Sequence, residues 1–213
     1  MRNYYLLVGP SGIGKSTWLK QTTEKLTSDG TSFYVASRDE IVHEVAKENG
    51  LTYSEMFLVP TEFAPEKTVL VFENGQRVFE LQHKLQSEVD SKFAKRLFEK
   101  LKDESVTNIY IDMTNLSRKT RKDHIKRFLG LNEPTWKVQA VSFLTNEQIA
   151  TDELKAKVLD VLVERCSKRT EQPISKEVLE KQLSRFTEPN IETETYLSEV
   201  VKVEVNLAMG EKV

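Results

Sequence analysis

The segment that most constrains the fold of this chain is GPSGIGKST, residues 9–17. It matches the pattern G-x-x-x-x-G-K-[ST] at Gly9, Gly14, Lys15 and Ser16. The apolar run YYLLV precedes it, and the helix-like run LKQTTEKL follows it. Glycines allow such a loop to turn sharply, so that several backbone N–H groups point inward toward an anion. The sequence therefore predicts a phosphate-binding loop between a strand and a helix.

The chemistry of this loop predicts that it binds ATP together with Mg²⁺. Lys15 would reach the β- and γ-phosphates, and the Ser16 hydroxyl would ligate the metal ion. The helix that follows points its positive dipole end at the same anion. A glycine-rich turn with a chance lysine is the alternative, and the flanking strand and helix argue against it. The residues predicted to bind the nucleotide are Gly9, Ser11, Gly12, Gly14, Lys15, Ser16 and Thr17.

Strand-like and helix-like runs alternate along most of the 213 residues. The strands are expected at about 3–9, 32–37, 108–113, 137–143 and 200–205. The helices are expected at about 82–101, after the N-cap Ser117, at 146–166 and at 175–186. Such alternation indicates βαβ units and a parallel sheet with helices on both faces. The length suits one α/β domain, predicted over 1–213, with five parallel strands.

One stretch interrupts this alternation. Residues 66–81, EKTVLVFENGQRVFEL, contain two strand-like runs on either side of Asn74-Gly75, a strong signal for a type I′ turn. The sequence predicts a β-hairpin here, within an insertion of about 60–81. Such a hairpin would cover an acceptor site or serve a partner, and the sequence leaves both possibilities open.

Composition excludes several classes of protein. No run of eighteen apolar residues is present, so no membrane-spanning segment is expected. The N-terminus enters a strand directly and lacks a signal-peptide pattern. A single cysteine, Cys166, excludes an internal disulfide and a cysteine zinc site. These features predict a cytoplasmic protein and leave its oligomeric state open.

Residues 118–127, RKTRKDHIKR, hold six basic side chains and one acidic side chain, Asp123. Arg118, Lys122 and Lys126 are spaced four apart, so they share one helical stripe, where like charges repel. A charged outer face is ordinary for a helix whose apolar face is Ile125, Phe128 and Leu129. The alternative is a polyanionic partner, nucleic acid or nucleotide phosphate, and the stripe favours it.

Two aspartates follow predicted strands. Asp39 comes after the second strand, and Asp112 ends the third. In a doubly wound sheet, ligands bind beyond the carboxyl ends of the strands. Asp39 is therefore a candidate general base for a hydroxyl acceptor, and Asp112 a candidate for holding the metal or its water. The alternative for each is a helix N-cap.

Two arginines lie near the end of a predicted helix, in the run LVERCSKRTEQPI. A phosphoryl-transfer site needs positive charge around the γ-phosphate in the transition state, and Arg165 and Arg169 are candidates to supply it. The alternative is that these side chains only offset the negative dipole end of the helix.

In combination, GPSGIGKSTW, SRD, DMTNL and ERCSKR followed by PI resemble the kinase domain of bacteriophage polynucleotide 5′-kinases, over about residues 1–186. The resemblance implies a P-loop kinase fold, Asp39 as the base on a 5′-hydroxyl, and Arg165 and Arg169 on a lid over the triphosphate. It implies transfer of the ATP γ-phosphate to a 5′-hydroxyl of DNA or RNA. It also places Asp112, Thr114 and Asn115 in the acceptor or metal region. Arg38, Arg118 and Lys122 complete the predicted substrate contacts.

The chain departs from that family in two ways. Where the family tends to have an arginine for the acceptor phosphate, three residues after the base, this chain has Val42. It also lacks the D-x-D-G-T phosphatase signature, so no accompanying phosphatase activity is expected. The alternatives are a kinase acting on a hydroxymethylated base in DNA, a small-metabolite kinase, and a nucleotide-binding regulator without transferase activity.

Overall fold

The computed structural model of the chain describes residues 1–57, 75–131, 134–169 and 174–207. The chain divides into two compact units. The first combines Met1–Ala36 with Leu97–Val213, and the second is Ser37–Arg96. The prediction of one domain over 1–213 stays a prediction.

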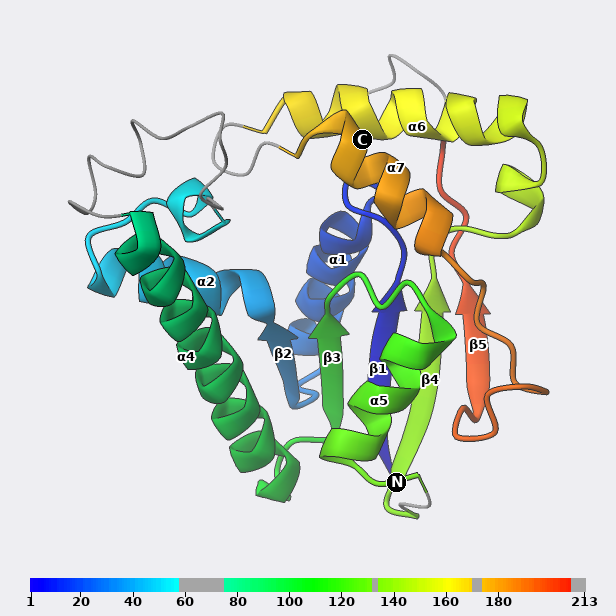
Figure 1. Cartoon of the computed structure of the whole chain (residues 1–213). Helices are drawn as coiled ribbons and strands as arrows, with labels where there is room; N and C mark the ends of the chain where they lie inside the picture. Colours follow the sequence, from blue (N-terminus) through cyan, green and yellow to red (C-terminus); the bar gives the residue numbers. More distant parts are fainter. Residues whose placement is uncertain (58–74, 132–133, 170–173, 208–213) are drawn as a thin grey trace. The chain divides into compact units, whose positions relative to one another are not determined.

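A five-stranded parallel sheet forms the centre of the first unit, as predicted (Figure 1). Its strands are β1 (Arg2–Val8), β2 (Phe33–Ser37), β3 (Asn108–Asp112), β4 (Trp136–Ser142) and β5 (Glu199–Lys202), in the order β2-β3-β1-β4-β5. β1 pairs in parallel with β3 on one side and with β4 on the other. Because β1 is central, its carboxyl end delivers the following loop to the middle of the sheet edge where ligands bind.

Helices α1 (Lys15–Ser28) and α5 (Arg118–Phe128) cover opposite faces of this sheet (Figure 1). Successive residues of a strand point to opposite faces, so the Tyr4 side chain faces the α5 layer and the Tyr5 side chain faces the α1 layer. The buried Tyr4 hydroxyl lies 2.7 Å from Nε2 of His124 on α5. Tyr5 stacks on Tyr110, and Trp18 of α1 contacts the Tyr110 ring edge-on. The predicted N-cap of α5, Ser117, is confirmed because its side chain accepts a hydrogen bond from the Thr120 N–H.

The predicted helix over 146–166 is divided in two. A short 3₁₀ helix, η2 (Glu147–Ile149), precedes α6 (Asp152–Ser167). Thr151 separates them, because its hydroxyl accepts the Leu154 N–H and so caps a new helix. The last predicted helix is present as α7 (Lys176–Arg185).

The second unit contains α2 (Arg38–Glu48), the 3₁₀ helix η1 (Ser54–Phe57) and most of α4 (Gly75–Lys102). Ile41, Val42 and Val45 of α2 are buried, as is Val89 of α4. Glu44 of α2 forms ion pairs with Lys92 and Arg96 of α4. These pairs are partly exposed to solvent, so each contributes little to stability.

The predicted hairpin over 66–81 is wrong in its second half, where α4 begins at Gly75 and continues through Leu81. Residues 66–74 lie outside the described residues. The run QRVFELQHKL alternates over its first few residues, but Val78, Leu81 and Leu85 also continue the helical spacing of the apolar stripe downstream. A long amphipathic helix already nucleated by that stripe extends at one hydrogen bond per residue, which outweighs a short strand signal.

Candidate functional site

The predicted phosphate-binding loop joins β1 to α1. Gly12 and Gly14 have positive φ values of 80° and 113°, which residues with a Cβ rarely adopt. A Cβ on Gly12 would lie 2.8 Å from the sulfur of Cys166, whereas a Cβ on Gly14 would meet open space. Gly12 is therefore required for close packing against α6, and Gly14 borders the open side of the loop.

The start of α1 is built to receive an anion. Its N-cap is Gly14, which has no side-chain cap, and its first turn contains no acidic residue. Lys15 is nearly buried, and its Nζ donates hydrogen bonds to the carbonyl oxygens of Gly9 and Pro10, at 2.8 and 2.9 Å. The next two residues, Ser16 and Thr17, are exposed. Helix N–H groups, a lysine and hydroxyls at one helix end fit the phosphates of a nucleotide.

The loop after β3 is hydrogen-bonded to the phosphate-binding loop. The carbonyl oxygen of Thr114 accepts the Gly9 N–H at 3.0 Å. Asn115 is buried, has a φ of 44°, and donates from Nδ2 to the Leu7 carbonyl at 3.0 Å. Its Oδ1 is buried without a hydrogen-bond partner among the described residues. Asn115 thus holds this loop against β1, a structural role beside the substrate contact predicted for it.

Asp112, the last residue of β3, ends at the same sheet edge as the phosphate-binding loop. Within the described ranges, His, Cys, Asp and Glu side chains form no cluster of three suited to a metal ion. A magnesium site in proteins usually combines one or two side chains with water and substrate phosphates. Ser16 and Asp112 are the protein residues predicted for it.

A buried ion pair packs against the loop that follows β3. Arg121 is fully buried and binds Glu194 through two nitrogens, Nε at 2.9 Å and Nη2 at 2.5 Å. Its Nη1 donates to the carbonyl oxygens of Asn115, Leu116 and Thr187. The prediction that all six basic residues of 118–127 form a surface patch is therefore wrong for Arg121. It lies on the apolar face, four residues before Ile125, and only a buried carboxylate makes that burial tolerable.

The other five basic residues of α5 are exposed. They are Arg118, Lys119, Lys122, Lys126 and Arg127. Arg118 donates from Nη2 to the Thr193 carbonyl, which does not neutralise its charge. The helix therefore presents a positive outer face that starts at the carboxyl edge of the sheet.

Helices α6 and α7 pack against the phosphate-binding loop. The buried Cys166 of α6 touches Gly12, and burial raises the pKa of its thiol, while the positive charges of Arg169 and Lys15 act to lower it. Arg165 donates to the Asn206 carbonyl at 2.5 Å, and the Arg169 N–H bonds to the Cys166 carbonyl.

Gln182 of α7 makes a reciprocal contact with the loop. Its Oε1 accepts the Ser11 N–H at 2.7 Å, and its Nε2 donates to the Ser11 hydroxyl at 3.2 Å. Sequence reasoning missed this residue, because a single glutamine on an exposed helical stripe gives no signal. Glu194 was missed for a similar reason, although Arg121 at an apolar position of α5 indicates that a buried acidic side chain must pair with it.

Asp39 and Arg38 open α2 in the second unit. The N-cap is Ser37, whose hydroxyl accepts the Glu40 N–H, so the capping alternative for Asp39 is wrong. Asp39 is exposed, and its Oδ1 accepts a hydrogen bond of 3.0 Å from the Tyr53 hydroxyl. Arg38 is bound to Asp90 at 3.0 Å and to another residue of α4, Gln86, at 2.8 Å. Tyr53 was also missed, because its contact with Asp39 depends on the packing of η1 against α2.

One comparison with a solved structure supports the fold. A fungal RNA kinase aligns with a TM-score of 0.54 at 12% identity, over 99% of this chain and 40% of that one. Kti12 of Chaetomium thermophilum, solved with ADP-AlF3, aligns at 0.49 and 15% identity over 94% and 88% of the two chains. A gluconokinase from Sinorhizobium meliloti aligns at 0.44 and 15% identity over 96% and 85%. No curated protein matches the chain.

At 12% identity, the alignment with the fungal RNA kinase establishes only a shared fold. Within the part of the chain that the structure describes, none of the helices has the length and apolarity needed to cross a membrane. The family model described as an AAA domain matches residues 5–189, which include the phosphate-binding loop, both predicted aspartates and both predicted arginines. The chain therefore belongs to this AAA domain family of P-loop proteins.

Proposed function

We propose that this protein is an ATP-dependent polynucleotide kinase that transfers the γ-phosphate to a 5′-hydroxyl of DNA or RNA. In this proposal, Lys15 and the N–H groups of the loop hold the phosphates. Ser16 and Asp112 hold Mg²⁺, which would offset phosphate charge when bound. The function rests on the sequence resemblance and on the geometry of the loop.

The observation that supports a polynucleotide acceptor is the position of the basic face of α5. The loop that precedes α5 is bonded to the phosphate-binding loop through Thr114 and Gly9. Arg118 follows four residues later, and Lys122 and Lys126 continue its stripe away from the site. A small hydroxyl acceptor needs no such extended positive surface, whereas a phosphodiester chain gains affinity from each phosphate that it neutralises.

Asp39 is proposed as the base that takes the proton of the attacking hydroxyl. It is exposed to solvent, it is not used as a helix cap, and the Tyr53 hydroxyl fixes one of its oxygens. The other oxygen remains to accept the substrate proton. A carboxylate in this role must be correctly positioned, because the proton leaves as the phosphoryl group arrives.

Arg169 and Arg165 are proposed to contact the γ-phosphate during transfer. The Arg169 N–H bonds to the carbonyl of Cys166, the residue whose sulfur packs against Gly12 of the loop. A cation placed there stabilises the charge of the transferring group without a further rearrangement of solvent.

The deciding experiment incubates the protein with γ-labelled ATP and each of three acceptors. These are a 5′-hydroxyl oligonucleotide, the same oligonucleotide carrying a 5′-phosphate, and DNA containing hydroxymethyluracil. Label on the first and none on the second supports the proposal. A folded Lys15→Ala variant is the matched control and should transfer nothing.

Val42 supports a second candidate, the kinase of a hydroxymethylated base. It is fully buried in α2, so this position offers no side chain to an acceptor phosphate. Label on the third acceptor alone would establish that alternative. Labelled phosphate released to water, with no acceptor modified, would instead indicate a nucleotide-dependent regulator.

The double variant Lys122→Glu/Lys126→Glu tests the basic face directly. It should raise the KM for the oligonucleotide, reduce the salt dependence of that KM, and leave the KM for ATP nearly unchanged. Lys155→Glu/Lys157→Glu on α6 changes the same number of charges and is the control. Equal salt slopes for wild type and the α5 variant would assign that face to solvation.

A further inference from the structure

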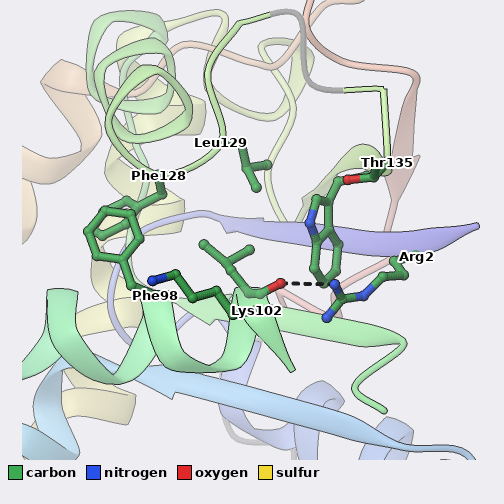
Figure 2. Close-up of a pocket in the computed structure, with 8 residues that line it drawn as sticks. Arg2, Phe98, Lys102, Phe128, Leu129 and Thr135 are labelled. Atoms are coloured by element: carbon green, nitrogen blue, oxygen red, sulfur yellow. Dashed lines mark hydrogen bonds between the residues drawn. The ribbon is translucent and has the colours of Figure 1, made fainter. Parts of the chain in front are cut away.

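A cavity of about 270 Å³ lies at the amino-terminal edge of the sheet in the first unit. Arg2 and Trp136, the first residues of β1 and β4, form one side of it, and the ends of α4 and α5 form the other. Figure 2 shows Phe98 and Phe128 together at one end and Arg2 near the other, with Lys102 between them. The volume is below the ~300–1,000 Å³ usual for drug-sized ligands, so it suits one small planar group.

The lining is aromatic and cationic. Phe98 is 40% exposed although it is apolar, and its ring lies 5.2 Å from that of the buried Phe128, centroid to centroid. None of the eight lining residues is acidic, and two are basic, Arg2 and Lys102. Nearby carboxylates do exist on the α4 side, where Asp103 pairs with Lys100. A polyanion would therefore approach from the α5 side.

The wall of this cavity is rigid before any ligand binds. The Arg2 guanidinium donates to the carbonyl oxygens of Lys100, Leu101, Asp103 and Val106. It also lies 3.9 Å above the Trp136 ring. An aromatic surface that is already ordered loses little conformational freedom when a ligand stacks on it.

The basic face of α5 connects this cavity to the phosphate-binding edge of the sheet. Arg118, Lys122 and Lys126 form a stripe along α5, and Arg127 lies over the Phe128 ring, 5.1 Å from its centre. Asp123 is the one acidic residue of that helix. Positive charge along a path that ends at an exposed aromatic ring is the pattern by which proteins hold single-stranded nucleic acid.

We infer that this cavity binds one base of the single-stranded acceptor, several nucleotides away from the end that receives the phosphate. The inference rests on the proposed function, because it requires a polynucleotide on α5. The seven residues of β1 separate the two edges by roughly 20 Å. At about 3.4 Å per stacked nucleotide, and more when the strand is extended, this distance corresponds to roughly four to six nucleotides.

The first test compares oligonucleotides of three and ten nucleotides that share a 5′-terminal sequence. The longer one should have the lower KM, and Phe98→Leu should raise that KM by about tenfold while leaving the trinucleotide unaffected. Leucine preserves the apolar contact and removes the ring. Tyrosine retains the ring, so Phe98→Tyr should keep the wild-type KM for both oligonucleotides. Leu154→Ala on α6, a similarly exposed apolar residue, is the control. Equal effects of Phe98→Leu on both lengths would overturn the inference.

The second test measures binding without catalysis. A fluorescent base analogue, 2-aminopurine, is placed in turn at each position of the ten-nucleotide strand. Quenching that is strongest at about the fourth to sixth position, and lost in Phe98→Leu, supports the cavity as a base site even if no phosphate is transferred. Uniform quenching along the strand overturns it, even if transfer is efficient. A change in sedimentation of Phe98→Leu without oligonucleotide would assign the ring to contact between copies and also overturn it.

Discussion

The stability of the first unit should fall as the pH drops below neutrality, because His124 is buried as the neutral ring. Its Nε2 lies 2.7 Å from the Tyr4 hydroxyl, and its ring contacts Phe128 at 4.8 Å between centroids. Burial, with a smaller effect from the positive charge of Arg127, lowers the pKa of His124 from 6.5 to about 4. In the unfolded chain the ring regains its ordinary pKa and binds a proton more readily.

The sign and size follow from this difference. Between about pH 6.5 and pH 4 the unfolded state binds more protons than the folded state, so the free energy of unfolding decreases as the pH falls. The stabilisation is fully present above pH 6.5 and is lost progressively down to about pH 4. A lowering of this size corresponds to about 3 kcal/mol over the whole range, of which about 2 kcal/mol is lost by pH 5.

Urea unfolding at several pH values between 8 and 5 measures this loss. Both tryptophans, Trp18 and Trp136, belong to the first unit, so their fluorescence reports on that unit alone. His124→Gln is the control, because an amide can still bond to the Tyr4 hydroxyl but does not titrate. The variant should be less stable at pH 8 and should lose much less stability by pH 5. Parallel pH profiles for wild type and His124→Gln would refute the reasoning.

Three further predictions concern the site. Asp39→Asn should fold normally and lower kcat at least a hundredfold with little change in either KM, since an amide cannot take a proton. Tyr53→Phe should lower kcat about tenfold, and a wild-type kcat in Asp39→Asn would exclude Asp39 as the base. Arg169→Ala should lower kcat more than tenfold at an unchanged Tm, whereas a lower Tm with normal kcat would indicate only a helix-end role. Gly12→Ala should weaken ATP binding by forcing the loop away from α6, and adding Cys166→Ala should restore part of it; no restoration would assign the whole loss to the positive φ of Gly12.

The sequence predicted the strands well because the signal for each is local. YYLLV, NIYID and the other apolar runs are short and bounded by polar residues. Four of the five became strands within about one residue of their expected limits, whereas β5 ends at Lys202, three residues before the expected limit. The backbone turn of the phosphate-binding loop was equally predictable, since Gly14 of the motif adopts a positive φ.

The errors arose where distant segments decide the outcome. The run after Gly75 satisfies both a strand and a helix pattern locally, and the long stripe downstream resolves it as α4. Arg121 reads as one more surface charge until Glu194, far along the chain, supplies its partner. Gln182 contacts Ser11 through the packing of α7, and Tyr53 separately contacts Asp39 in the second unit. No spacing in the sequence encodes either contact.

The buried pair of Arg121 and Glu194 also determines how much of the chain must be kept for the first unit to fold. The family match ends at residue 189, but Glu194 and β5 lie beyond it. A chain cut at the family limit would leave the Arg121 guanidinium buried without its carboxylate, at a cost of about 3–5 kcal/mol. That loss falls on the same loop that supports Gly9 through Thr114. A chain that extends past Glu194 should therefore be more stable than one cut at residue 189.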